Sequence, residues 1–226
     1  MRTTVGREMS GILGIENRTE NWKTAVQFSP LFHGECGQFA EKLGAIPVPE
    51  SGDVKIELFW KGMRDYFYRE SLSRESFSRE DFVQRAVDLY DRNFSNLRQE
   101  VIAFQEFRDL KEDHYTSTSE TANRLMNSLL GTEVDVVLET PKHLFIGEVK
   151  HESTFGADGK LVLVHQLMRQ YVTATILLQL SGENKAVIPF VVGDRVEYLK
   201  KTSQVRFMTN QGWLKETNVL DWEQVK

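Results

Sequence analysis

Apolar runs punctuated by charged residues predict strands at three places in this chain. In residues 54–60, valine, isoleucine and leucine alternate with lysine and glutamate, which is typical of a strand with one buried face. In the segment 133–151, two apolar-rich runs flank a Thr-Pro-Lys turn at 140–142, which predicts a hairpin. The apolar run 186–192 suits a strand buried on both faces.

Helical spacing predicts the elements between these strands. Residues 32–44 form a short helical pattern, and the sequences Ser78–Asp81 and Ser117–Glu120 each resemble a capping box that begins a helix. The helix that begins at Ser117 would run to residue 129. The longest apolar run, 161–180, is interrupted by polar and charged side chains, so it predicts a buried amphipathic helix and not a membrane span.

Two polar stretches predict connectors. The run 16–21 is interpreted as a loop that leads into a helix. Near-copies of a five-residue pattern, Arg-Glu-Ser-x-Ser, fill residues 69–82. A period of five fits neither helix nor strand, and so few copies are too short for a solenoid, so this stretch is interpreted as a polar connector.

From residue 116 onward the predicted order is helix, strand, strand, helix, strand. The strand at 54–60 can join the same sheet, in which case the helix at 32–44 belongs to the core and residues 61–115 are an insertion. We therefore expect an α/β fold in two parts. Residues 1–115 form a largely helical N-terminal region that can contribute a strand and a helix to the core, and residues 116–226 form the core itself.

The predicted hairpin carries the side chains with the clearest chemical meaning. Successive side chains of a strand point to opposite faces, so Glu148 and Lys150 share a face while Val149 points away between them. Asp135 lies on the preceding strand. Carboxylates on neighbouring strands suit a hard cation such as Mg²⁺, which keeps several waters for substrate. The lysine supplies a localised charge that can hold a water or a phosphate, as cleavage of a phosphodiester requires.

At these residues the chain resembles the PD-(D/E)xK nuclease superfamily, which includes restriction endonucleases and Holliday-junction resolvases. Asp135 matches the metal-binding aspartate of that superfamily, and Glu148-Val149-Lys150 matches its (D/E)xK element. The likeness covers residues 116–195 and departs at Val134, where the name-giving proline would stand. The resemblance implies a restriction-endonuclease-like mixed sheet flanked by helices, here with a helical N-terminal elaboration. It also implies magnesium-dependent hydrolysis of nucleic-acid phosphodiesters, with DNA preferred over RNA.

The resemblance also assigns roles to these residues. Asp135 and Glu148 would bind Mg²⁺, or Mn²⁺ in its place, and the carbonyl of Val149 would add an oxygen ligand. Lys150 would orient the attacking water or stabilise the developing negative charge. The alternative without a functional role is a solvent-exposed hairpin with an incidental Glu-Lys pair. Such a pair would contribute less than about 1 kcal/mol to stability.

A further metal-binding acid often comes from the first core helix of this superfamily. Glu120 takes that place if the helix begins near residue 117, although it also has a structural role in its capping box. If the first helix lies earlier, the candidates are Glu35 and Glu41. Glu133 shares a strand face with Asp135 and is another candidate, with an exposed acid at a strand end as the alternative.

The helix predicted at 161–180 carries one polar stripe, whose members are spaced i, i+3, i+4 and i+7: Gln166, Arg169, Gln170 and Thr173. The superfamily often places a glutamine or a basic residue here. The resemblance therefore implies a catalytic Gln166 that contacts water or phosphate, and an Arg169 and a Gln170 that bind nucleic acid. A stripe facing solvent is the alternative. Tyr171 misses the spacing of the superfamily's Gln-x-x-x-Tyr element by one residue and receives no role.

Composition limits these hypotheses. A formal net charge of −5 argues against a surface that binds polyanions in general, although a local basic cleft is compatible with it. The single cysteine, Cys36, excludes an internal disulfide framework and a multi-cysteine zinc site. It also fits a cytoplasmic location, and residues 1–10 lack the apolar core of a signal peptide. Trp213 and Trp222 are interpreted as core residues, with stacking on bases as the alternative.

Three functional hypotheses follow. The first is a metal-dependent endonuclease or exonuclease that acts on nucleic acid, DNA by preference, away from membranes, with a homodimer left open. The second is a catalytically inactive nuclease-like module that binds nucleic acid or serves assembly. The third is an unrelated α/β protein with an accidental motif. The complete set of Asp135, Glu148 and Lys150 favours the enzyme, whereas the acidic net charge favours the inactive module.

Overall fold

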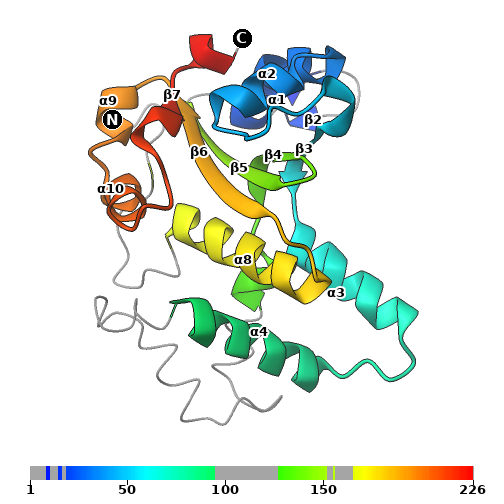
Figure 1. The fold of residues 1–226 in the computed structure, drawn as a ribbon. Coiled ribbons are helices and arrows are strands. Elements are labelled where there is room, and N and C mark those ends of the chain that lie inside the picture. Colours follow the sequence, from blue (N-terminus) through cyan, green and yellow to red (C-terminus); the bar gives the residue numbers. More distant parts are fainter. Residues whose placement is uncertain are drawn as a thin grey trace.

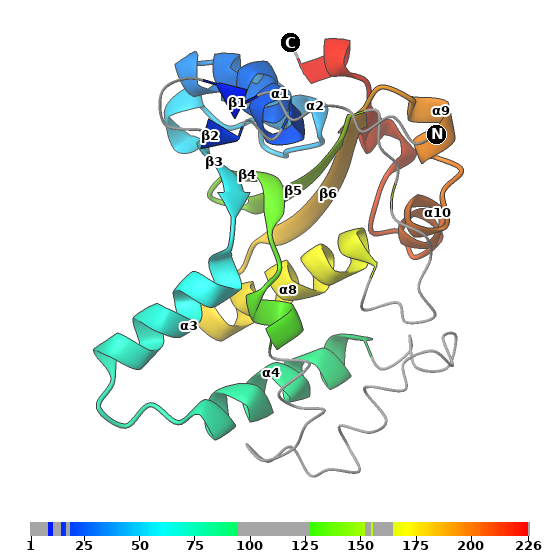
Figure 2. The same cartoon turned by 180° about the vertical axis from the view of Figure 1, so that it is seen from behind.

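The computed structural model describes residues 9–10, 15–16, 19–94, 127–151, 155 and 165–225. Within these residues a five-stranded mixed sheet has helices packed against both of its faces (Figures 1 and 2). The strands, in their order across the sheet, are β3 (Lys55–Trp60), β4 (Val134–Glu139), β5 (His143–Lys150), β6 (Ala186–Gly193) and β7 (Val219–Leu220). The predicted α/β class with a mixed sheet is confirmed.

Strand direction changes in the middle of the sheet. β3, β4 and β5 are antiparallel neighbours, whereas β6 runs parallel to β5 and β7 runs parallel to β6. The predicted hairpin is confirmed, and the Thr140 hydroxyl closes its turn by accepting the N–H groups of Lys142 at 3.3 Å and His143 at 2.9 Å. The predicted strand at 54–60 is confirmed as β3. A parallel partner for β5 requires a crossover, which contains α8 (Gln166–Ser181).

One face of the sheet is covered by α8, on which further helices pack. These are α3 (Gly62–Ser73), α4 (Arg79–Phe94) and α10 (Ser203–Asn210). α4 begins where the capping box predicts, because the N–H of Asp81 donates to the Ser78 hydroxyl at 3.2 Å. Since α8 has the sheet on one side and helices on another, most of its side chains are buried, which explains its apolar sequence.

The opposite face is covered by α1 (Thr19–Phe28) and α2 (Cys36–Lys42). Phe28, Phe39 and Phe190 meet in this core with ring centroids 5.6, 6.0 and 6.5 Å apart. Gly147 on β5 leaves room for them, because a Cβ at that position would lie 2.2 Å from the Phe190 ring. The aromatic core therefore packs directly on the β5 backbone, one residue before Glu148.

Short elements complete the described part of the chain. They are β1 (Met9–Ser10), β2 (Ile15–Glu16), η1 (Ser29–His33), η2 (Ser51–Asp53), α9 (Val196–Leu199), η4 (Glu216–Asn218) and η5 (Trp222–Val225). β1 and β2 pair with each other as an antiparallel ribbon outside the main sheet. None of the described helices has the length and apolar character to cross a membrane.

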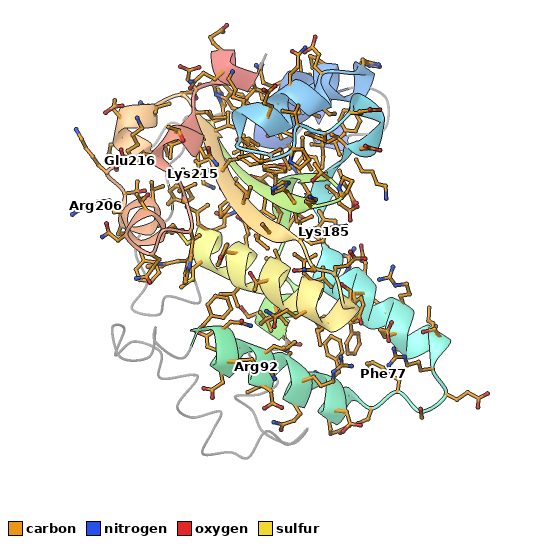
Figure 3. All side chains as sticks on the ribbon, in the orientation of Figure 1. Phe77, Arg92, Lys185, Arg206, Lys215 and Glu216 are labelled. Carbon is orange, nitrogen blue, oxygen red and sulfur yellow. The ribbon has the colours of Figure 1, made fainter. Side chains whose placement is uncertain are left out.

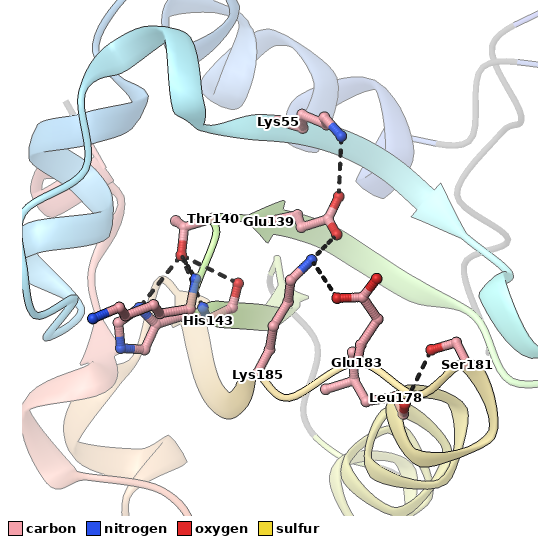
Figure 4. A network of polar contacts seen from close by, with 9 residues as sticks. Lys55, Glu139, Thr140, His143, Leu178, Ser181, Glu183 and Lys185 are labelled. Carbon is pink, nitrogen blue, oxygen red and sulfur yellow. Dashed lines mark hydrogen bonds and ion pairs between the residues drawn. The ribbon is translucent and has the colours of Figure 1, made fainter.

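A network of ion pairs joins three strands at the turn end of the hairpin (Figure 4). The carboxylate of Glu139, the last residue of β4, lies 3.7 Å from the Lys55 Nζ and 2.5 Å from the Lys185 Nζ. The Lys185 Nζ also lies 3.4 Å from the Glu183 carboxylate. Because Lys55 begins β3 and Lys185 immediately precedes β6, the network ties both strands to the end of β4.

Some predicted boundaries are corrected by the structure. α1 begins at Thr19, so the run 16–21 is not wholly a loop. The helix predicted at 32–44 is shorter, because Gly34, with a φ of 122°, separates α2 from η1. Of the helix predicted at 117–129, residues 117–126 lie outside the described residues, and 127–129 are helical.

The polar connector predicted at 69–82 is also shorter. Its first five residues belong to α3, its last four to α4, and only 74–78 join the two helices. Phe77 lies between these helices (Figure 3), with its ring centroid 5.2 Å from that of Phe67 and 6.0 Å from that of Phe82. Aromatic packing thus determines the path of a segment whose composition is mostly polar.

Candidate active site

The carboxyl end of β5 carries an acid and a base that are both buried. Glu148 is 1% exposed and Lys150 is 9% exposed, and the Lys150 Nζ lies 2.5 Å from the Glu148 Oε1. Both side chains contact α8, whereas Val149 packs into the core on the opposite face of the sheet. Strand alternation therefore places the pair together, and the exposed hairpin considered as an alternative is wrong.

Asp135 lies beside this pair on β4. Val136 is opposite Gly147, so the antiparallel register continues with Asp135 opposite Glu148. The Asp135 Oδ2 accepts the N–H of Val149 at 2.8 Å, which holds the aspartate side chain against the end of β5. The structure thus brings together the three residues of the sequence motif.

The edge strand β3 is distorted at the position opposite Asp135. β3 pairs with β4 on either side of Phe59, but Phe59 itself, at the position that faces Asp135, has a φ of 56°. A bulky residue in the left-handed region is strained, and such strain is concentrated near functional sites. The interruption places an irregular stretch of the edge strand opposite Asp135.

The polar stripe of α8 covers the pair from the helix side. The Gln166 Oε1 accepts a hydrogen bond from the Lys150 Nζ at 3.1 Å. The Gln170 Nε2 donates to the Glu148 Oε2 at 2.6 Å and to the Glu133 carbonyl oxygen at 2.9 Å. The stripe therefore faces the sheet and not solvent. It joins the helix to β5 and to the residue that immediately precedes β4.

Arg169 lies on the same stripe and is half-buried. Its Nε is shielded from solvent and has no hydrogen-bond partner among the described residues. Burial lowers the pKa of the guanidinium, and the nearby Glu148 carboxylate raises it. Arg169 thus adds positive charge near Glu148, and it has hydrogen-bonding capacity that the described residues do not use.

The electrostatics of Glu148 are dominated by its burial. Removal from water and, to a lesser degree, the charge of Asp135 raise the pKa of this carboxyl group, while Lys150 and Gln170 lower it, and together these influences bring the pKa to about 8. Without a cation, Glu148 therefore holds a proton near neutral pH. A divalent cation between the two acids would favour their charged forms, because it would neutralise charges that otherwise repel each other.

Three other acids named by the sequence are described by the structure, and none of them joins this site. Glu133 forms an ion pair with Lys61, with 2.9 Å between the nitrogen and oxygen atoms, and only its main-chain carbonyl contacts Gln170. Glu35 and Glu41 are exposed residues beside and within α2, which packs on the other face of the sheet, so neither can supply the third carboxylate. Glu120 lies outside the described residues.

The oxygen atoms at this site suit one kind of metal ion better than another. Among the described residues, no group of three or more His, Cys, Asp and Glu side chains is arranged to hold one. The candidate ligands are the carboxylates of Asp135 and Glu148, with the Val149 carbonyl as a third oxygen. Mg²⁺ is commonly held by one or two carboxylates and several waters. The set therefore fits Mg²⁺ better than zinc, which takes three or four nitrogen, sulfur or oxygen ligands from the protein.

Gln170 differs from its prediction as a nucleic-acid contact. It is 1% exposed and its amide nitrogen is used within the protein, so its role is to hold Glu148. Phe155 was missed altogether, although its ring centroid lies 5.2 Å from the Lys150 Nζ in a cation–π contact. The sequence indicates that Gln170 belongs beside Gln166, since it lies one helical turn later on the same face. It contains no comparable indication for Phe155, which follows the hairpin without a periodic pattern.

The two tryptophans near the C-terminal end have different surroundings. Trp213 stacks on Tyr171 with a centroid distance of 4.7 Å and an interplanar angle of 16°, so its interpretation as a core residue is confirmed. Trp222 is only half-buried and packs at the edge of the other core.

Comparison with known proteins adds no independent assignment. No family model, no curated protein and no solved structure matches this chain. The candidate site therefore has to be judged by its own residues: two carboxylates on neighbouring strands, a buried lysine, and a helix whose glutamines hold both members of the Glu-Lys pair.

Proposed function

We propose that this protein is a magnesium-dependent nuclease that hydrolyses phosphodiester bonds of DNA, with a fold of restriction-endonuclease type. The observation that carries this proposal is the buried Glu148–Lys150 pair beside Asp135 at the end of a hairpin. A Glu-Lys pair of purely structural use contributes little net stability when buried, because desolvation offsets its attraction. The free energy that desolvation of the pair costs is explained if the lysine and the acids serve a reaction.

Each residue has a role in this proposal. Asp135, Glu148 and the Val149 carbonyl would hold Mg²⁺ or Mn²⁺, and Glu120 remains a candidate for a further ligand. When bound, the cation would polarise the phosphate and lower the pKa of a coordinated water. Lys150 would place its positive charge next to the attacked phosphate.

The helix positions the lysine and supplies a phosphate contact. Gln166 and Glu148 accept hydrogen bonds from the same ammonium group, so they fix its position from two directions. A positioned donor is more effective than a mobile one, because it needs no reorganisation during the reaction. Arg169, which is half-buried on the same stripe, would place its positive charge near a phosphate of the bound nucleic acid.

A cleavage assay with matched lysine variants tests the proposal. Plasmid, linear duplex and single-stranded DNA are incubated with the protein in Mg²⁺ and, separately, in EDTA. Lys150→Ala should reduce cleavage by roughly a hundredfold or more, on the scale of losing a preorganised transition-state contact. Lys185→Ala is the control, because Lys185 forms an equally close pair with Glu139 at the other end of the hairpin (Figure 4). Equal activity of the two variants would contradict the role of Lys150.

One observation favours a second candidate, a nuclease-like module without catalysis. Both oxygens of Glu148 already accept hydrogen bonds, from Lys150 and from Gln170, and the described residues contain no third acid at the site. Such a module would bind DNA equally well with Mg²⁺ and with EDTA and would leave it intact. The same assay, read for binding by gel shift and for cleavage by product length, separates the two functions.

A further inference from the structure

A second concave surface lies at the same end of β5 as the candidate site, on the other face of the sheet. It has a volume of about 340 Å³, and its walls include Trp22, Val26, His151 and Trp222. We call it the Trp22–Trp222 groove. His151 directly follows Lys150 and, by strand alternation, points to the opposite face. A bound polymer that passes the end of β5 can therefore contact the groove and the candidate site together.

The groove is built from parts of the chain that are far apart in sequence. α1 supplies Trp22 and Val26, and η5 supplies Trp222. α1 packs against both β5 and η5, and the Gln27 Nε2 donates to the Trp222 carbonyl oxygen at 2.8 Å. The two tryptophans are thus held at the same groove by a defined contact between their elements.

The walls expose apolar surface that the rest of the described protein does not cover. Trp22 is 60% exposed and Val26, one turn further along α1, is 52% exposed. Adjacent apolar side chains left in water are unfavourable and commonly mark a binding surface. The Trp222 Nε1 is shielded from solvent and has no hydrogen-bond partner among the described residues. The groove therefore presents apolar surface that includes two indole rings, whereas the Trp222 N–H lies beneath that surface.

Charge at the groove selects among occupants. Lys23 lines it, and its Nζ contacts the His151 Nε2, while the His151 Nδ1 lies 2.9 Å from an Asp194 carboxylate oxygen. The groove thus has a basic side chain, Lys23, and an acidic one, Asp194, whose carboxylate is held by His151, so Lys23 is the group that suits a phosphate next to an aromatic ring. A nucleotide has both parts, and any base can stack on an indole because every base has a π-face.

We propose that the Trp22–Trp222 groove holds an unpaired base of the substrate, which makes single-stranded DNA, or the single-stranded part of a branched or frayed DNA, the preferred substrate. This inference rests on the proposed nuclease function. Bases within a duplex are stacked on each other and cannot enter such a groove without being unstacked. The volume is near the lower limit for ligand sites and suits one nucleotide better than a longer segment.

Binding and cleavage are measured separately to test this inference. The full-length protein is titrated in EDTA against a labelled oligothymidylate of roughly 12 nucleotides, within the usual range of single-strand site sizes. Trp22→Ala should weaken binding by roughly 5- to 100-fold, the range expected when one stacking contact is lost. Trp22→Phe, which keeps an aromatic face, should restore most of the affinity. Tyr68→Ala is the matched control, because Tyr68 is 58% exposed on α3, away from the groove.

The outcomes distinguish failure of this inference from failure of the nuclease function. If Trp22→Ala loses affinity and the wild type also cleaves DNA, both proposals stand. If Trp22→Ala loses affinity and the wild type never cleaves, the groove binds bases and the nuclease function is wrong. If the protein cleaves DNA but Trp22→Ala and Tyr68→Ala bind the oligonucleotide like the wild type, the groove proposal is overturned. A change from dimer to monomer in Trp22→Ala, seen by light scattering without an effect on DNA binding, would also overturn it and assign the groove to a second copy of this chain.

Discussion

Replacing Glu148 with glutamine should change how the stability of the metal-free protein depends on pH. Burial and Asp135 raise the pKa of Glu148 from 4.5 to about 8. In the unfolded chain the same group loses its proton near its ordinary pKa. Between these two values the folded state holds one proton more than the unfolded state, so stability falls as the pH rises through this window. Below pH 4.5 and above pH 8 the group contributes no slope.

The size of the effect follows from the same shift. Each pKa unit corresponds to about 1.4 kcal/mol, so Glu148 lowers the free energy of unfolding by up to about 5 kcal/mol across the window. Between pH 5 and pH 7 the loss is up to about 3 kcal/mol. Glu148→Gln cannot titrate and should lack this component. Changed hydrogen bonds to Lys150 and Gln170 would move its whole curve up or down while leaving that component absent.

Urea unfolding in EDTA at a series of pH values, followed by tryptophan fluorescence, measures this difference. The control is Glu139→Gln, because Glu139 also lies 2.5 Å from a lysine, but its side chain is 37% exposed. The control should keep the wild-type slope between pH 5 and pH 7, whereas Glu148→Gln should be flatter. Parallel curves for the wild type and Glu148→Gln would refute the assignment of a raised pKa to this buried acid.

Three further substitutions probe the surroundings of the site. Gln166→Ala should lower the turnover number for DNA cleavage by roughly 10- to 100-fold, because Lys150 loses one of its positioning contacts. A thermal melt of this variant should show little change in stability. Unchanged turnover would exclude Gln166 from the site. Arg169→Ala should weaken DNA binding more at low than at high salt, as titrations at two salt concentrations would show; equal weakening at both would exclude a phosphate contact. Gly147→Ala should lower the free energy of unfolding, measured in urea, by about 1–3 kcal/mol, because its Cβ would overlap the Phe190 ring. Wild-type stability would show that the Phe190 ring can move to make room.

Much of the sheet could be predicted because its strands have strong local patterns. The hairpin has apolar runs on both sides of a Thr-Pro-Lys turn, and strand alternation places Glu148 and Lys150 on one face. The strand at 54–60 was recognisable from its alternation, and the resemblance to the nuclease superfamily, whose core has one more strand before the one with the aspartate, suggested that it joins the same sheet. By contrast, β7 has only two residues, Val219 and Leu220, and a pair of apolar residues carries no period that could be recognised.

The candidate site was predictable in its members but less so in their surroundings. A helical stripe indicates that Gln166 and Gln170 share a face, but not that this face meets the Glu-Lys pair, because the orientation of α8 depends on packing against α3, α4 and α10. The burial of Gln170 follows from that packing as well. Phe77 shows the same limit, because its neighbours in sequence are polar and only its contacts across two helices explain its position.

The pairing of β3 with β4 has a consequence for the order in which the chain folds. The hairpin closes across a turn of three residues. For β3 to pair with β4, Trp60 must meet Val134, which closes a long loop that contains α3 and α4. Closing a long loop costs more conformational entropy than closing a short one and slows the formation of its contacts. The hairpin should therefore form first, with Asp135 and Glu148 side by side in water, before α8 covers them. Glu148 would take up its proton only at that later step, so the rate of the final folding step should depend on pH even where the rate of hairpin formation does not.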